Sequence, residues 1–284
     1  MAKSWSTEPS EALRVRAGFD LASADLAATP GWEHGEKSAE KRLAADGVHL
    51  GEEQERLFAQ GRSGGTRSVL LVLQGMDTAG KGGIVRHVLG LVDPQGVQLR
   101  SFGVPTEKER AQHYLQRIRE ALPAPGHIGV FDRSHYEDVL VVRVNQLVPR
   151  EVWEPRYDEI NAFEQEVVDS GTVIVKVALL VSVAEQKARL RERLERPDKY
   201  WKFNPGDIDE RAKWPLYQEA YQAVLDRTST DHAPWYAVPA DNKWYARLAV
   251  GRLLRGALEG LDPEWPPADF DVAAETARLD AQPF

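Results

Sequence analysis

The fold of this chain is decided by the stretch VLLVLQGMDTAGKGG, residues 69–83. Its first five residues form a continuous apolar run, which is typical of a strand buried on both faces. The glycine-rich residues 75–83 follow, and GIVRHVLGLV then has a helical pattern. A glycine-rich turn between strand and helix can point backbone N–H groups at an anion, and the helix N-terminus adds about half a positive charge. We therefore predict a phosphate-binding loop rather than a turn that only joins a strand to a helix.

This loop departs at one position from the usual pattern G-x-x-x-x-G-K-[ST]. Gly82 stands where a Ser or Thr hydroxyl normally helps to hold Mg2+. Lys81 is present, and its ammonium group can reach terminal phosphates as a mobile charge. The residues that we predict to cradle phosphate together with Lys81 are Gly75, Ala79, Gly80, Gly82 and Gly83.

Two carboxylates can replace the missing hydroxyl. Asp77 lies inside the loop, and Asp132 ends the apolar run HIGVFD, where P-loop enzymes place a second metal-binding carboxylate. Two carboxylates suit Mg2+, which prefers oxygen ligands and keeps several waters. We predict Asp77 and Asp132 as metal ligands, and Arg133 as a phosphate contact. The alternative roles of these three residues are a turn residue, a helix cap and a surface ion pair.

Four more apolar runs predict strands, at residues 97–102, 127–132, 172–183 and 235–240, and helical stretches alternate with them. This order predicts an α/β fold with a five-stranded parallel sheet covered by helices on both faces. We divide the chain into an N-terminal arm (1–65), a P-loop domain (66–260) and a C-terminal extension (261–284). Within the arm, residues 26–41 are expected to form a loop, and a helical period follows at Leu50, Leu57 and Phe58.

A basic segment, residues 187–202, holds seven basic and three acidic residues in a chain of net charge -8. Arg189, Arg193 and Arg196 have the spacing i, i+4, i+7, so we expect them to share one helical face. The segment follows the third long strand, where P-loop kinases carry a lid whose arginines neutralise a transferring phosphoryl group. We predict phosphate contacts from Arg189, Arg193, Lys199 and Lys202, against the alternative of a solvated charged face. Pro197 should end the helix, and Asp207 or Asp209 should cap the next one.

The overall composition is that of an ordinary globular protein, with 42% apolar and 28% charged residues and no cysteine. The absence of thiols agrees with a reducing compartment. No run approaches the roughly 18 apolar residues of a membrane span, and the first residues lack the apolar core of a signal peptide. We expect a cytoplasmic protein that binds neither membranes nor nucleic acid, since the chain is acidic overall.

Five blocks of the sequence, in order, resemble the polyphosphate kinase 2 family over about residues 40–255: VLQGMDTAGKGG, VFDRSHYEDVLVVRV, RYDEINAFE, EQKARLRERLERPDKYWKF and STDHAPWYAVPADNKWYARLAV. The resemblance implies a P-loop kinase fold like that of thymidylate kinase, with three layers (α/β/α) and a helical lid at about residues 190–215. Residues 66–260 would then be a phosphotransferase domain. Homodimers or homotetramers are common in the family.

The implied reaction is Mg2+-dependent phosphoryl transfer between inorganic polyphosphate and nucleoside mono-, di- and triphosphates. The catalytic residues carried over by matched position are Asp77, Lys81, Asp132, Arg133, Arg193 and Asp207. The chain departs from common family patterns at Gly82, at Gly103 and in AQHYLQRIRE, which lacks a usual Trp. FDRSHYEDVLVVRV is most similar to members that phosphorylate both monophosphates and diphosphates, so ADP, GDP and AMP are the expected acceptors.

Three other functions are alternatives to this one. An ATP-dependent nucleotide kinase of the same fold would normally keep the loop hydroxyl and would not need so basic a lid. A non-catalytic protein that binds polyphosphate or nucleotide would not need Asp77, Lys81, Asp132 and Arg133 together. An RNA-binding module fits the basic and aromatic residues after 187, but not the acidic balance of the chain.

Overall fold

A central parallel sheet organises the computed structural model, which describes residues 3–283. Its strands are β1 (Ser68–Gln74), β2 (Val97–Ser101), β3 (Ile128–Asp132), β4 (Thr172–Leu180) and β5 (Trp235–Pro239), in the order β2-β3-β1-β4-β5. All four neighbouring pairs are parallel. The predicted five-stranded parallel sheet is therefore confirmed. β1 is buried along its whole length because it is the middle strand, which explains its unbroken apolar sequence.

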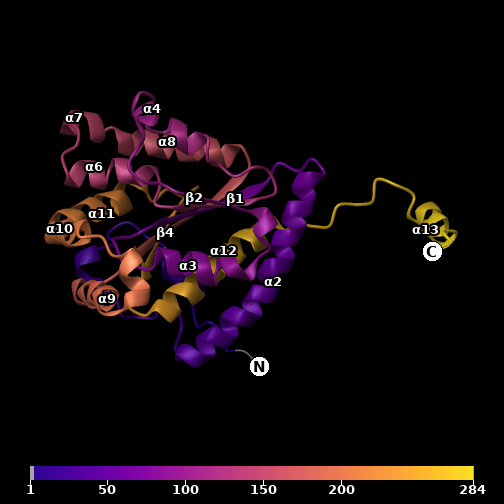
Figure 1. Ribbon diagram of the computed structural model, residues 1–284, viewed down its shortest axis with the longest axis horizontal. Coiled ribbons are helices and arrows are strands. Elements are labelled where there is room, and N and C mark those ends of the chain that lie inside the picture. Colours follow the sequence, from indigo (N-terminus) through magenta and orange to yellow (C-terminus); the bar gives the residue numbers. More distant parts are fainter. Residues whose placement is uncertain (1–2, 284) are drawn as a thin grey trace.

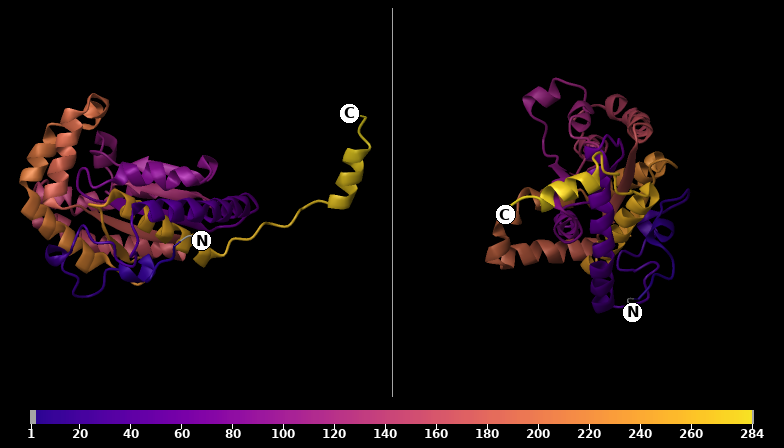
Figure 2. Two further views of the ribbon diagram at one scale, coloured as in Figure 1. Left: turned by 90° about the horizontal axis from the view of Figure 1, so that it is seen from below. Right: turned by 90° about the vertical axis from the view of Figure 1, so that its right-hand side faces the viewer.

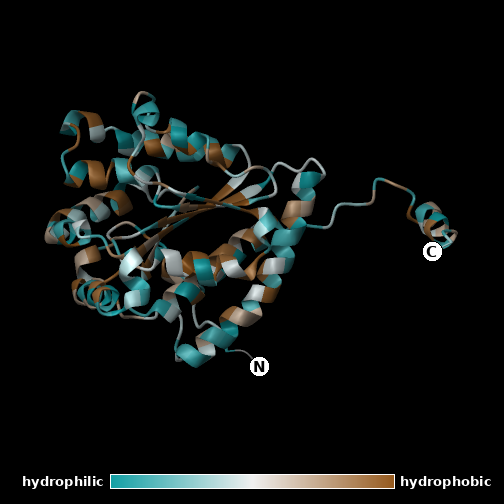
Figure 3. Cartoon of the chain, in the orientation of Figure 1, coloured by the Kyte–Doolittle hydropathy of each residue, from teal (hydrophilic) through white to brown (hydrophobic). Residues whose placement is uncertain are grey.

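Helices cover both faces of the sheet (Figure 1). One face packs against α2 (Glu36–Arg62), α3 (Lys81–His87) and α12 (Lys243–Leu261), and receives Val69, Leu71 and Leu73 of β1. The other face packs against α8 (Arg156–Asp169) and α11 (Trp214–Thr228), and receives the alternate residues Leu70 and Val72. Apolar residues concentrate between these layers in Figure 3. The three-layer α/β/α arrangement is as predicted.

The segment before β1 differs from the prediction. Residues 26–41 were expected to be a loop, but α2 begins at Glu36 and continues for 27 residues. Its first turns carry few apolar residues, so they show no period, and packing of Leu50 and Leu57 into the sheet core supplies the stability. Further upstream, the N–H of Val15 bonds to Trp235 O and the N–H of Ala237 bonds to Leu13 O, so this segment runs along β5.

The lid segment follows β4 and consists of α9 (Val183–Glu195), a 3-10 turn η5 (Pro197–Lys202) and α10 (Gly206–Ala212). Pro197 ends α9 as predicted. Arg196 has an extended backbone, so it leaves the helical face that carries Arg189 and Arg193. The expected cap at Asp207 or Asp209 is wrong, because both lie in the first turn of α10.

The remaining elements are short. They are α1 (Pro9–Ala12), η1 (Leu21–Ser23), η2 (Leu89–Leu91), η3 (Pro94–Gly96), α4 (Glu107–Arg110), α5 (Gln116–Arg119), η4 (His135–Asp138), α6 (Val141–Val144), α7 (Arg150–Trp153) and α13 (Val272–Asp280). After α12 the chain leaves the body of the molecule as an extended arm that ends in α13 (Figure 2). No helix within residues 3–283 is long and apolar enough to cross a membrane.

Candidate active site

A cavity of about 690 Å3 lies at the carboxyl ends of the strands. Its walls include the loop after β1, the last residues of β2 and β3, and the lid segment. The strand order runs outward from β1 in both directions, through β3 on one side and β4 on the other. In open α/β sheets such a reversal point leaves a crevice at the strand ends, and ligands bind there.

The loop after β1 has the geometry of an anion cradle. Gly80 has a φ of 117°, which an L side chain rarely adopts, and it caps α3 directly before Lys81. The N–H groups of Thr78, Gly80, Lys81 and Gly82 have no hydrogen-bond acceptor anywhere in residues 3–283. An added Cβ on Gly80 or Gly82 would enter open space, so an anion can approach this backbone closely.

Gly75 has a packing role that the sequence did not predict. A Cβ there would lie 2.7 Å from the carbonyl oxygen of Leu179, so glycine is needed for the loop to pack on β4. Gly75 does not line the large cavity, whereas the other predicted cradle residues do. Its carbonyl accepts a 2.6 Å hydrogen bond from Lys81 Nζ. Burial lowers the pKa of Lys81, while Asp77 acts to raise it, so the ammonium is held inside the loop beside a carboxylate.

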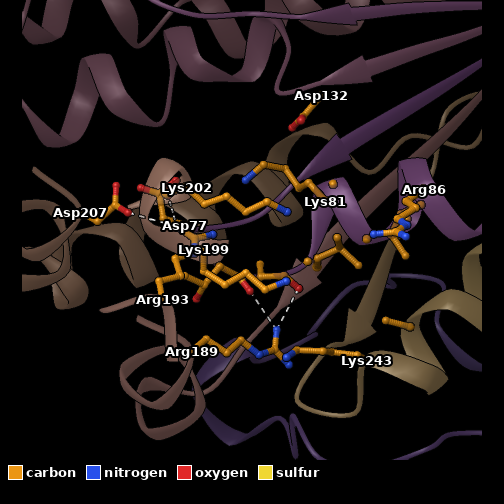
Figure 4. Close-up of a pocket in the computed structure, with 18 of the residues that line it drawn as sticks. Asp77, Lys81, Arg86, Asp132, Arg189, Arg193, Lys199, Lys202, Asp207 and Lys243 are labelled. Carbon is orange, nitrogen blue, oxygen red and sulfur yellow. Dashed lines mark hydrogen bonds and ion pairs between the residues drawn. The ribbon is translucent and has the colours of Figure 1, made fainter. Parts of the chain in front are cut away.

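The two predicted metal ligands both line the cavity. Asp77 Oδ1 lies 3.1 Å from Arg133 Nη2, and Figure 4 shows Asp77 and Asp132 with Lys81 between them in that view. No group of three or more His, Cys, Asp or Glu residues with metal-binding geometry occurs in residues 3–283. Two carboxylates nevertheless fit Mg2+, because this ion takes its other ligands from phosphate oxygens and water.

All four predicted lid cations line the cavity: Arg189, Arg193, Lys199 and Lys202. Arg193 Nη1 donates to Lys202 O at 2.9 Å and to Asp207 Oδ2 at 3.2 Å, which joins α9 to η5 and α10. Burial, and then the nearby Asp77, raise the pKa of Asp207. Arg193 and Asp207, both predicted from the family resemblance, therefore form an ion pair, although a turn and a helix start separate them in the sequence.

The structure corrects the prediction for Arg189. Only 5% of this residue is exposed, and all five of its N–H groups have acceptors. These acceptors are the carboxylate of Glu185 and the carbonyl oxygens of Thr78, Ala79, Ala240 and Asp241. A phosphate contact would require one of these bonds to break, so the expected phosphate contact is not formed by this geometry.

Four basic residues on the far wall of the cavity were not among the predicted site residues. Arg86 and His87 come from α3, and Lys243 and Arg247 come from the first turns of α12. Both pairs follow a strand that ends at the site, and Lys243 and Arg247 have the spacing i, i+4, so these two signals could have identified them.

Glu137 was also missed. It lines a smaller pocket of about 50 Å3 beside the large cavity, together with Asp77, Arg133 and Tyr217. Its carboxylate accepts from Gln74 Nε2 at 3.0 Å. Burial raises the pKa of Glu137, and the neighbouring Arg133 acts to lower it. The site therefore has two compartments, a large basic one and a small one lined by both carboxylates and cations.

Comparison with known proteins identifies the family of this chain. The model of the family "Polyphosphate kinase 2 (PPK2)" matches residues 33–265. An AMP/ADP-polyphosphate phosphotransferase of Meiothermus ruber is 46% identical over 248 residues, which cover 87% of this chain and 91% of that protein. An ADP-polyphosphate phosphotransferase of Rhodopseudomonas palustris is 42% identical over 229 residues, covering 76% and 78%.

A solved structure shows the same similarity. The crystal structure of polyphosphate kinase 2 from Arthrobacter aurescens TC1 superposes with a TM-score of 0.96 at 50% identity, and the match covers 99% of both chains. The phosphate loop, the carboxylate that ends β3 and the basic lid all lie within the span of the family match. The chain belongs to the polyphosphate kinase 2 family.

Proposed function

We propose that the chain transfers phosphoryl groups between inorganic polyphosphate and nucleotides, with Mg2+ as the metal. The observation that carries this proposal is the large cavity, where a phosphate loop faces three lid cations besides Arg189 and a wall with three more cations, Arg86, Lys243 and Arg247. A nucleotide triphosphate tail would need far fewer positive charges. A chain of phosphates could contact all of them, because every phosphate along the chain carries negative charge.

The two compartments suggest where each substrate binds. Polyphosphate would lie in the large cavity along Arg193, Lys199 and Lys202, with its terminal phosphate on the cradle and Lys81. The acceptor nucleotide would present its phosphate from the side of Asp77 and Arg133. Its attacking oxygen is already ionised near neutral pH, so direct in-line transfer needs positioning and charge neutralisation rather than a covalent enzyme intermediate.

Asp77 and Asp132 are the residues that would hold Mg2+, which supplies positive charge at the transferring phosphate. Lys81 and Arg133 would hold phosphate oxygens, and Arg193 would add charge when the lid is in place. Asp207 would orient Arg193 through their ion pair. We keep AMP, ADP and GDP as acceptors. The similarity of FDRSHYEDVLVVRV to dual-acceptor members and the printed name of the Meiothermus protein support AMP and ADP.

We extend the proposal to a cytoplasmic homo-oligomer, a dimer or a tetramer. Nucleotide substrates and the absence of cysteine support the location. The exposed C-terminal arm supports association, because Trp265, Phe270 and Leu279 are each more than half exposed on it.

The test is an assay of purified protein with Mg2+ and long-chain polyphosphate, with AMP, ADP or GDP in separate reactions and products separated by chromatography. ATP from ADP is the expected product, with ADP from AMP as well. If ATP phosphorylates a nucleotide while polyphosphate gives no product with any acceptor, the chain is an ATP-dependent kinase instead.

Lys81→Ala is the reference for loss of chemistry in this assay. It should lower kcat by about 100-fold or more, because the charge beside the transferring phosphate is lost. Lys108→Ala, which removes an exposed lysine of α4 outside the cavity, is its control.

A further inference from the structure

One helix, α9, donates hydrogen bonds to three consecutive carbonyl groups of the phosphate loop. The carbonyl of Asp77 accepts from Gln186 Nε2 at 3.2 Å. The carbonyls of Thr78 and Ala79 accept from Arg189 Nη1 at 2.9 and 3.3 Å (Figure 4). Both donors belong to α9, and both are buried, with 1% of Gln186 and 5% of Arg189 exposed.

The direction of these carbonyls sets the direction of the cradle. In a trans peptide the C=O of one residue and the N–H of the next point to opposite sides. Carbonyls of Asp77 and Ala79 that point to α9 therefore turn the N–H groups of Thr78 and Gly80 away from it, and these N–H groups have no acceptor within residues 3–283. Thr78 has a φ of 68°, a conformation that a β-branched residue adopts only when its surroundings hold it.

The same helix is also bonded to the other two elements of the lid, η5 and α10. Arg211 of α10 donates from Nη1 to Gln186 Oε1 at 2.6 Å, so one amide joins the lid to the Asp77 carbonyl. Four residues further along α9 from Arg189, Arg193 binds Asp207 and Lys202 of the lid. Nη2 of Arg189 donates to the carbonyls of Ala240 and Asp241 after β5, which anchors the helix to the sheet.

We propose that Gln186 and Arg189 are positioning residues that fix the peptide orientation of the phosphate loop and couple it to η5 and α10 of the lid. Arg189 acts through its planar five-donor fork, which no single ammonium group can replace. This inference rests on the proposed phosphotransfer. It assigns Arg189 a positioning role instead of the phosphate contact that the sequence predicted.

Arg189→Lys and Arg189→Met separate the two roles, measured as kcat, KM for polyphosphate and the salt dependence of that KM. If the guanidinium of Arg189 holds the loop, kcat should fall about 100-fold in both variants, because the backbone N–H donors of the loop are misplaced. KM for polyphosphate should change little. A phosphate contact would instead be largely restored by Lys, and Met would raise KM and weaken its salt dependence. Near-normal kcat in Arg189→Lys would overturn the proposal.

Hydrogen exchange supplies a readout that does not depend on activity. The amides of residues 77–82 should exchange faster in Arg189→Lys than in the unchanged chain, while β1 and β4 keep their protection. If exchange rises throughout the sheet, the variant is merely unfolding, and the Gln186 variants then carry the test.

The lid connection is tested with Gln186→Met, Arg211→Met and the double variant. Because Arg211 reaches the loop through Gln186, the double variant should lose no more kcat than Gln186→Met alone. Losses that multiply would show that the two residues act separately and would overturn the coupling. An inactive unchanged chain would sink the proposed function, whereas an active one with unaffected variants would sink only this inference.

Discussion

Lys176 is a charged residue in the middle of the apolar strand β4, and it is fully buried. Its Nζ lies 2.5 Å from Glu164 Oε2 and donates to Tyr136 Oη at 2.9 Å and to Thr228 O at 2.6 Å. Glu164 also bonds to His135 Nε2 at 3.1 Å. All three ammonium protons therefore have partners, which is the condition under which a buried charge is tolerated.

We predict that Lys176→Met lowers the free energy of unfolding by about 3–5 kcal/mol, because it leaves a buried carboxylate without its cation. Urea denaturation measures the change. Lys176→Met with Glu164→Gln removes both charges and should recover much of the loss. A single variant that costs under about 1 kcal/mol would mean that water enters this part of the core.

The pH dependence of this pair has a defined sign. Burial acts to raise the pKa of Glu164, but Lys176 and His135 outweigh it and the pKa is lowered on folding. The stability that Glu164 contributes is thus present above its unfolded pKa and is lost as pH falls through its folded pKa. Glu164→Gln should be less stable than the unchanged chain at neutral pH, and the difference should shrink in acid. A constant difference across an acid titration would contradict this.

Among the elements, the lid carries Lys199 and Lys202, which line the cavity proposed to bind polyphosphate. Lys199→Ala and Lys202→Ala should each raise KM for polyphosphate, by up to about 10-fold at low salt, with a smaller effect at high salt. KM for the nucleotide should change little, since its phosphate approaches the smaller compartment. Lys187→Ala is the matched control, because Lys187 is an exposed lysine on α9 that does not line the cavity. Equal effects in all three variants would point to general charge attraction instead.

Two of the three glycines in helix α2 have opposite surroundings. A Cβ on Gly61 would lie 2.6 Å from the Cα of Gly126, whereas a Cβ on Gly51 would have no atom closer than 3.4 Å. Alanine favours a helix over glycine by about 1 kcal/mol, so propensity alone predicts a gain at both positions. We expect Gly61→Ala to lower the free energy of unfolding by about 1–3 kcal/mol instead, because the backbones at Gly61 and Gly126 must move apart.

Thermal unfolding of both variants checks this prediction. Gly51→Ala should unfold at the same temperature as the unchanged chain or higher, and Gly61→Ala lower. A stabilised Gly61→Ala would show that α2 can shift away from the loop at Gly126 without cost.

At the scale of the whole molecule, the C-terminal arm stands out from the body in Figure 2. Every residue of α13 is exposed, and nine residues are too few for a helix to be stable alone in water. We predict that a chain ending at Leu261 has a lower mass in light scattering than the full chain, because the arm contributes to association. None of the cavity residues lies in the arm, so kcat should stay within about twofold. An unchanged mass would place the association surface elsewhere.

Much of the fold could be predicted because β1, β3 and β4 are buried on both faces, so their apolar runs stand out in any chain that contains them. The loop between β1 and α3 was equally clear, since its glycines and Lys81 act through neighbouring backbone atoms. Asp132 could be placed because parallel strands end at one edge of the sheet, beside Leu73 of β1. The start of α2 could not, because its helical turns depend on packing and not on their own residues.

Other features depend on which side chains the folded chain brings together. Arg189 and Arg193 have the same charge on the same helix and both line the cavity, yet Arg189 is bonded to carbonyls of the phosphate loop whereas Arg193 is bonded to Lys202 and Asp207. Glu137 and Lys176 look like an exposed acid and a misplaced lysine until their partners, distant in sequence, are known. Local patterns report burial and backbone conformation, which act over a few residues. The role of a charged side chain depends on acceptors and counter-charges supplied by remote segments, and only folding determines those.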